Sequence, residues 1–245
     1  MRPRFLITLL SEDKSESTWR GLKAILQKLL RRFEDDGFTP RIEIVPADPS
    51  VRPILIRNRW RSTEAKDEVS KRELWRYLAR KVAEPGGFVV FHYDGDTRWS
   101  KSTESPARAQ FDREVRIRVA QVLSGSQRSP EEISQQMGRI IECVPFYSVE
   151  VWTYQATARA IALCREKYRG ADVEKFEAWG ADRTKLDDEW KPKEQSCLRD
   201  EHNEELGKHV PVWKVAQAGC SMTYRSNSAP SSAFNFWKFL RMSSV

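Results

Sequence analysis

The first 95 residues alternate between two patterns of hydrophobic and polar positions. Uninterrupted apolar runs bounded by turn residues are typical of buried strands, and apolar residues that recur every three or four positions are typical of helices with one buried face. The pattern predicts strands at residues 4–10, 41–47 and 88–93, helices at residues 11–33 and 62–82, and an irregular connection with two prolines and four arginines at residues 49–62. This order predicts an α/β fold with a mainly parallel sheet flanked by helices.

The second half of the chain is less regular. Its pattern predicts helices at residues 107–123, 131–142 and 153–168, strands at 144–151 and 210–216, a Ser-rich loop at 221–232 and an aromatic helix at 234–240. The apolar pair Ile140-Ile141 ends the second of these helices, and Glu150 lies in the first of these strands. A charged helical insertion is predicted at about 156–209. One domain is therefore expected over 1–245, with its core at about 1–155 and 210–245.

Composition limits the class of protein. The chain has 245 residues, of which 40% are hydrophobic and 11% aromatic, which suffices for one sizeable core and excludes a disordered chain. No apolar stretch approaches the ~20 residues that span a membrane, and the apolar run near the start is too short for a signal peptide, so a cytoplasmic protein is predicted. The four cysteines form no CxxC pair and are interpreted as buried thiols. The net charge of +7 permits a polyanionic partner.

Acidic residues follow three of the predicted strands. Glu12 and Asp13 come after the first strand, Asp94 and Asp96 come after the 88–93 strand, and Glu150 lies in the third strand-like segment. Because ligands of open α/β sheets bind beyond the carboxyl ends of the strands, these side chains are expected to converge, and oxygen ligands suit Mg²⁺ or Mn²⁺. A simpler interpretation stays open. Asp-Gly is a common turn dipeptide, and acids at a helix start interact with the helix dipole.

With these residues in view, the chain resembles the Toprim domain, which occurs in topoisomerases, primases and OLD-family nucleases. A strand that ends in an acidic residue before a helix, followed by a strand that ends in DxD, carries the resemblance. The segment SEDKSESTWRGLKAIL is similar to the first motif of small bacterial Toprim-like proteins, VPFYSVEVWTYQA to their later motif, in which a Glu precedes a Trp, and SNSAPSSAFNFWKFL to the stretch that closes those chains. Residues 49–82 and 170–209 lie outside the resemblance.

The resemblance implies a site and a cofactor. Glu12 would be the Toprim glutamate, acting as general base or metal ligand, Asp94 and Asp96 would hold Mg²⁺ (or Mn²⁺), and Glu150 would be the glutamate of the later motif. The Toprim glutamate is usually preceded by an apolar residue and followed by glycine, whereas Ser11 and Asp13 flank Glu12 here. Glu16 is therefore a second candidate for the same role, and both residues are candidate metal ligands.

The implied function is a metal-dependent nuclease that cleaves DNA or RNA in bacterial antiphage defence and works with a partner protein such as an ATPase. The alternative is a catalytically degenerate Toprim-like subunit that binds or regulates within a larger, ATPase-containing complex. The two differ in the surroundings of the acids. An enzyme needs Glu12, Asp94 and Asp96 around one point, whereas a non-catalytic subunit would have them paired with arginines.

The remaining polar candidates lie next to the DGD sequence. Arg98 and Lys101 follow it closely and are predicted to contact a nucleic-acid backbone, unless they only solvate a loop. His92, inside the 88–93 strand, is interpreted as a buried, hydrogen-bonded core histidine. The chain has no P-loop, GxGxxG, GxSxG or HExxH pattern, so nucleotide hydrolysis, dinucleotide binding and zinc proteolysis have no support in the sequence.

Overall fold

A parallel β-sheet forms the centre of the protein. The computed structural model describes residues 4–31, 41–95, 105–145, 149–181, 197, 199–211, 221–226 and 229–231. Its parallel strands have the order β2–β1–β3–β4 and comprise β1 (Arg4–Ser11), β2 (Arg41–Pro46), β3 (Gly87–His92) and β4 (Ile140–Val144). Strand β5 (Ser221–Ser226) pairs antiparallel with β4, and β6 (Ala229–Ser231) pairs antiparallel with β5. The structure thus confirms the α/β class and the flanked parallel sheet.

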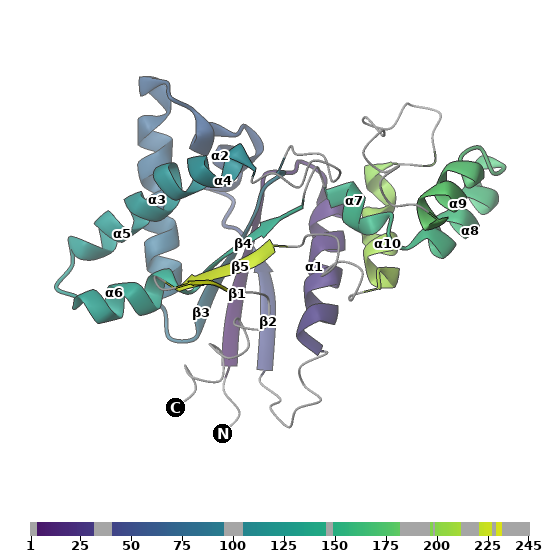
Figure 1. Ribbon diagram of the computed structural model, residues 1–245. Coiled ribbons are helices and arrows are strands. Elements are labelled where there is room, and N and C mark those ends of the chain that lie inside the picture. The colour runs from purple at the N-terminus through teal and green to yellow at the C-terminus, as the bar shows by residue number, and fades with distance from the viewer. Residues whose placement is uncertain are drawn as a thin grey trace.

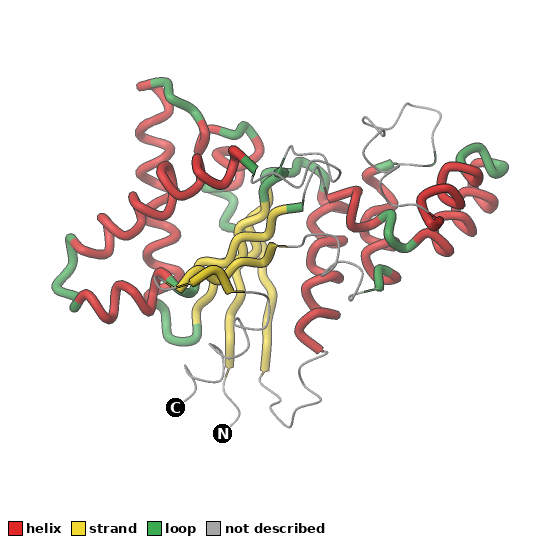
Figure 2. The backbone as a smooth tube through the Cα atoms, viewed as in Figure 1, coloured by secondary structure: helices red, strands yellow, loops and turns green. Residues whose placement is uncertain are grey.

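Helices cover both faces of this sheet (Figures 1 and 2). One side holds α1 (Glu16–Arg31), α7 (Val149–Thr153) and α10 (Asn203–His209), with α8 (Thr157–Tyr168) and α9 (Val173–Ala181) beyond them. The other side holds α2 (Arg52–Ile56), α3 (Glu68–Ala83), α4 (Pro106–Phe111), α5 (Ile117–Ser124) and α6 (Pro130–Met137). Short 3-10 turns occur at Arg59–Arg61, Ala65–Asp67 and Asp200–His202, and a π-helical turn at Asp112–Arg116 joins α4 to α5. None of the described helices combines the length and the apolar composition that a membrane-spanning segment requires.

Two hydrophobic cores, one on each face, hold the helices to the sheet. Successive side chains of a strand point to opposite faces, so Ile7 and Leu9 of β1 pack with α1, while Leu10 packs with α2 and α3. In β3 and β4 the same alternation divides buried residues between the two cores. Strands that are covered on both faces read as continuous apolar runs, which is why the sequence pattern located β1 and β3.

Several predicted elements differ from the structure. The apolar pair Ile140-Ile141 belongs to β4 and not to a helix, which ends at Met137. Glu150 lies in the first turn of α7 and not in a strand. The 49–62 connection contains α2 and a 3-10 turn, because Ile54, Leu55 and Trp60 are buried under the sheet.

The C-terminal part differs as well. Residues 221–226 and 229–231, predicted as loop, form β5 and β6, because the open edge of β4 offers backbone groups to a further strand. The helices within 156–209 contribute Phe176 and Trp179 to the same core as β1. The predicted strand at 210–216 falls mainly, and the helix at 234–240 entirely, outside the described residues.

Helices α1 and α10 meet at a pair of glycines. A Cβ added at Gly207 would lie 2.6 Å from the carbonyl oxygen of Gly21, and one added at Gly21 would overlap the carbonyl oxygen of Asn203. The close approach fixes the start of α10 against α1.

Gly207→Ala is therefore expected to lower the free energy of unfolding by about 2 kcal/mol, because overpacking forces the two backbones apart. Gly125→Ala is the matched control, since a Cβ there would meet its nearest atom at 3.5 Å. Urea unfolding measures both variants. Equal stability of the two would show that the glycine contact is not needed.

Candidate functional site

Glu12 and Asp94 meet where β1 and β3 end. The Glu12 N–H donates to the carbonyl oxygen of His92 (3.3 Å), so pairing of the two strands continues one residue past β1. The Asp94 N–H then donates to Oε1 of Glu12 (2.7 Å). Parallel pairing thus brings together two acidic residues that are 82 positions apart in the chain, at the end of the sheet that the sequence predicted.

Arg61 balances the charge of Glu12. Its Nη2 lies 3.2 Å from Oε2 of Glu12 and also donates to the carbonyl oxygen of Asp94 (3.1 Å). The guanidinium lies over the rings of Trp60 and Tyr93, 4.7 Å and 5.5 Å from their centroids. Both charged side chains are largely buried, so the pair is a fixed part of the site and not a surface ion pair.

His92 is a core residue, as predicted. It is fully buried, and its Nδ1 is hydrogen-bonded to the Ser11 hydroxyl (3.0 Å), whose oxygen accepts the Asp13 N–H (3.2 Å). Burial, together with the nearby Arg61 charge, lowers the pKa of His92 to about 3, so the ring is neutral at physiological pH. Its Nε2 lies 3.7 Å from Oδ1 of Asp94. Ser11 therefore ties the neutral ring to the loop that carries Asp13.

Asp13 lies among like charges. Burial, and after it the carboxylates of Glu150, Asp200 and Glu12, together raise its pKa to about 7, although a hydrogen bond from the Ser15 backbone opposes the shift. Two carboxylates that approach each other cannot both ionise freely, and a divalent cation relieves this repulsion. Asp13 thus marks the most negative part of the site. The acidic edge, as we call it, comprises Glu12, Asp13, Asp94, Glu150 and Asp200.

A buried asparagine positions Glu150. Asn203 is fully buried, and its Nδ2 donates to Oε1 of Glu150 (3.1 Å) and to Oγ1 of Thr18 (3.0 Å). The Thr153 hydroxyl donates to its Oδ1 (3.0 Å). These bonds join α1, α7 and α10 at one point. Asp200 lies in the 3-10 turn directly before α10, and so reaches the acidic edge through the same packing.

The other predicted site residues lie elsewhere. Glu16 is exposed and pairs with Arg20 along α1 (2.6 Å), so the structure keeps it on the helix surface. Asp96, Arg98 and Lys101 are outside the described residues. No role was predicted for Asp200, Arg61 or Asp13, although Asp13 was noted as an acid that follows the first strand. The positions of all three side chains in the site depend on tertiary packing. The one sequence signal was the run of two acids directly after β1.

The acidic edge is not a closed metal cage. Within the described ranges, the group whose ligand atoms all lie within 4.8 Å of one another is Cys164, Asp172 and Cys197, and no three carboxylates of the acidic edge form such a group. The carboxylates interact through space, as the pKa of Asp13 shows, and a cation would have to draw them together or bind with water as additional ligand.

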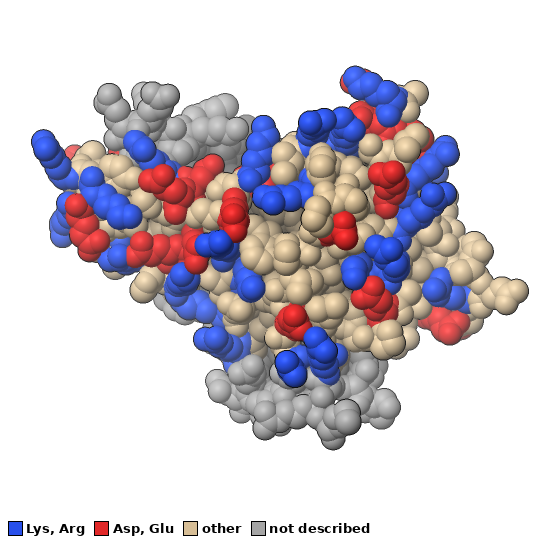
Figure 3. Space-filling model, turned by 180° about the vertical axis from the view of Figure 1, so that it is seen from behind, with Lys and Arg blue, Asp and Glu red and all other residues tan. Residues whose placement is uncertain are grey.

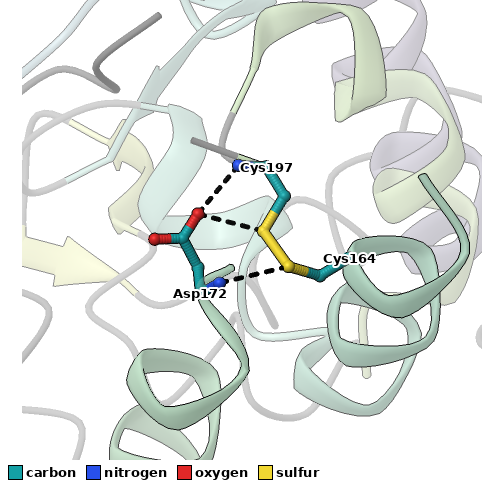
Figure 4. Close-up of side chains that lie close together, drawn as sticks. All are labelled: Cys164, Asp172 and Cys197. Atoms are coloured by element: carbon teal, nitrogen blue, oxygen red, sulfur yellow. Dashed lines mark hydrogen bonds between the residues drawn. A yellow bond between two sulfur atoms is a disulfide. The ribbon is translucent and has the colours of Figure 1, made fainter. Parts of the chain in front are cut away.

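Two of the cysteines are bonded, which corrects the prediction of four buried thiols. Cys164 and Cys197 form a disulfide, with Cα atoms 5.4 Å apart (Figure 4). Their separation of 33 residues gave no sequence signal, and folding of α8 against the 197–203 segment brings them together. Cys143 is a buried thiol, as predicted, and Cys220 is outside the described residues.

Comparisons give no relative for this chain: no protein-family model, curated protein or solved structure matches it.

Proposed function

We propose that this protein binds a divalent cation, Mg²⁺ or Mn²⁺, at the acidic edge and hydrolyses phosphodiester bonds of DNA or RNA, as a nuclease of Toprim type. The observation that carries the proposal is the meeting of Glu12 and Asp94 where the parallel strands β1 and β3 end, beside Asp13, whose pKa is raised by burial and by the neighbouring carboxylates. Carboxylates gathered at this end of an α/β sheet are typical of a site that is completed by a cation.

The donor set fits a hard cation. Asp13, Glu150, Asp200 and Asp94 supply carboxylate oxygens, which Mg²⁺ and Mn²⁺ prefer, and Asp96 follows two residues after Asp94 in the chain. When bound, such a cation polarises a phosphoryl oxygen and stabilises charge on the attacked phosphate. Glu12 is held by Arg61, so its role here is to orient the Asp94 backbone rather than to supply free negative charge.

A nucleic-acid substrate is also supported by charge. The net charge is +7, and seen from behind, Lys and Arg side chains are spread over the face of the molecule, with Asp and Glu side chains among them (Figure 3). Basic side chains around an acidic centre attract the phosphate backbone while the cation screens the carboxylates. We extend the proposal to antiphage defence with an ATPase partner, which the resemblance to Toprim proteins supports.

The test is cleavage of supercoiled plasmid and of RNA with Mg²⁺, Mn²⁺ or a chelator. Asp94→Asn and Glu150→Gln are each expected to lower metal-dependent cleavage by about 100-fold or more, because each removes one ligand charge. Glu43→Gln is the matched control, since Glu43 pairs with Arg4 on β2. Glu16→Gln decides whether Glu16 has a catalytic role. Cleavage that persists in a chelator, or in Asp94→Asn, would contradict the proposal.

One observation favours the second candidate, a catalytically degenerate binding or regulatory subunit. Glu12, the residue that the resemblance makes the general base, is paired with Arg61 at 3.2 Å. The Arg61 guanidinium neutralises the charge of this carboxylate, which a metal cation would otherwise do. Cation binding without cleavage, in the protein alone and with its partner ATPase, would establish this candidate instead.

A further inference from the structure

A second group of possible metal ligands lies away from the acidic edge. Cys164 of α8, Asp172 of the α8–α9 connection and Cys197 are all buried, and their ligand atoms lie within 4.8 Å of one another (Figure 4). Oδ2 of Asp172 accepts the Cys197 N–H (2.8 Å) and lies 3.0 Å from Cys197 Sγ. The Asp172 N–H lies 3.3 Å from Cys164 Sγ. The carboxylate thus contacts the sulfur pair directly.

A tight turn holds two of these ligands in place. Helix α8 ends with Arg169 and Gly170 in the left-handed conformation, at φ of 54° and 79°. The Gly170 N–H donates to the carbonyl oxygen of Cys164 (3.1 Å), which folds the chain back so that Asp172 returns to Cys164. The hydrogen bond that closes this turn joins backbone atoms and does not involve the disulfide. Cys197 is therefore the ligand that a separate segment adds.

The Asp172 carboxylate adds a third ligand atom to the two sulfurs. A disulfide is uncharged and needs no carboxylate beside it, whereas burying a carboxylate costs free energy unless its partners compensate. The Nζ atom of Lys175 lies 3.6 Å from Oδ1, the other oxygen of the Asp172 carboxylate. Cysteine sulfurs and a carboxylate oxygen are both ligand types that zinc accepts, and a zinc site with three protein ligands takes a water in the fourth position.

We propose that the reduced form of this group binds a thiophilic divalent cation of the Zn²⁺ class, and that the disulfide and the metal complex are alternative states of one site. A dithiol reductant supplies two electrons and two protons, which convert the Cys164–Cys197 bond into two thiols while the reductant becomes a disulfide. The cation then displaces both thiol protons to solvent and binds two thiolates and the Asp172 carboxylate.

Both the disulfide and the metal complex would hold Cys197 to α8. Cys197 precedes Asp200 by three residues and Asn203 by six, and these two residues build the acidic edge from the α10 side. A metal complex would therefore keep α8 attached to this segment under reducing conditions, where the disulfide opens. The site would preserve the position of Asp200 in both states.

The experiment compares reduced and oxidised protein. After reduction with a phosphine and removal of the reductant without oxygen, Cd²⁺ is titrated as probe and thiolate-to-metal charge-transfer absorbance is recorded. We expect one Cd²⁺ per reduced chain and at least tenfold weaker binding by oxidised protein. Cys164→Ser should lose the absorbance, while Cys143 and Cys220 remain in every sample. Asp172→Asn should weaken binding at least about tenfold.

Thermal unfolding keeps the test decisive where a variant does not fold. Zn²⁺ added to reduced, unsubstituted protein should raise its Tm, whereas oxidised protein should not respond. Absence of both charge transfer and a Tm shift in the reduced protein would overturn the proposal. Charge transfer that persists in Cys164→Ser, or unchanged affinity of Asp172→Asn, would also overturn it.

Discussion

Asp13→Asn is expected to stabilise the protein at pH 8 by about 2 to 3 kcal/mol and to leave its stability at pH 4 nearly unchanged. Asp13 has an ordinary pKa of 3.8 when unfolded and about 7 when folded. A raised carboxyl pKa contributes stability that is complete below pH 4 and is lost as the pH rises through 7. Three pKa units correspond to about 4 kcal/mol, which salt screening of a partly exposed group reduces. Urea unfolding between pH 4 and 8 measures the difference.

The effect of Asp13 is the difference in the free energy of unfolding between Asp13→Asn and the unsubstituted protein at each pH. The pH dependence of one protein alone does not isolate this effect, because other groups titrate as well. His92, with its pKa lowered to about 3, contributes stability that is lost as the pH falls from 6.5 to 3, and so partly cancels the effect of Asp13. Asp48→Asn is the matched control. The Ser50 backbone and hydroxyl lower the pKa of Asp48, so its substitution should act in the opposite direction. If Asp13→Asn destabilises the protein at pH 8, the like-charge description of the acidic edge is wrong.

Reduction of the Cys164–Cys197 disulfide, in the presence of a chelator, is expected to lower the free energy of unfolding by about 4 kcal/mol. The bond closes a loop of 33 residues, and the entropy that this closure removes from the unfolded chain gives that magnitude. The corresponding fall in Tm is about 10 °C for a chain of this size. Differential scanning calorimetry with and without reductant measures it.

The control is the double variant Cys164→Ser/Cys197→Ser, which should have the Tm of the reduced protein under both conditions. A reduced protein whose Tm equals that of the oxidised protein would show that the 197–203 segment is held by its other contacts alone. Asn203, the glycine contact of α10 and the hydrogen bond between Tyr168 and His202 are among the contacts that could do so.

The sequence located the parts of the fold in which one pattern dominates. Strands β1 and β3 are continuous apolar runs that end in acids or turns, and α1 has a clear apolar stripe, so each was found within a few residues. Strand β4 was missed because its apolar run is short and is interrupted by Glu142, so it does not distinguish a buried strand from a helix end. Strands β5 and β6 were missed because they pair along the open edge of β4, and this pairing between distant segments leaves no local pattern.

In the candidate site, too, some features could be predicted from the sequence and others could not. The approach of Glu12 to Asp94 follows from the rule that parallel strands end at one edge, and the sequence predicted it. Arg61 was seen as part of an Arg-rich segment, but its pairing with Glu12 requires the 3-10 turn that Trp60 anchors in the core. Asp200 becomes part of the site when α10 packs on α1, which no local pattern encodes.

The central claim is that the acidic edge binds a divalent cation, and calorimetric titration of Mn²⁺ into the oxidised protein at pH 8 tests it most directly. Mn²⁺ prefers oxygen ligands, and the disulfide closes the thiol site. We expect one Mn²⁺ per chain, weaker binding at pH 6, where Asp13 holds its proton, and at least tenfold weaker binding by Asp13→Asn and Glu150→Gln than by Glu43→Gln. No binding by the unsubstituted protein, or equal affinity in all variants, would contradict the claim.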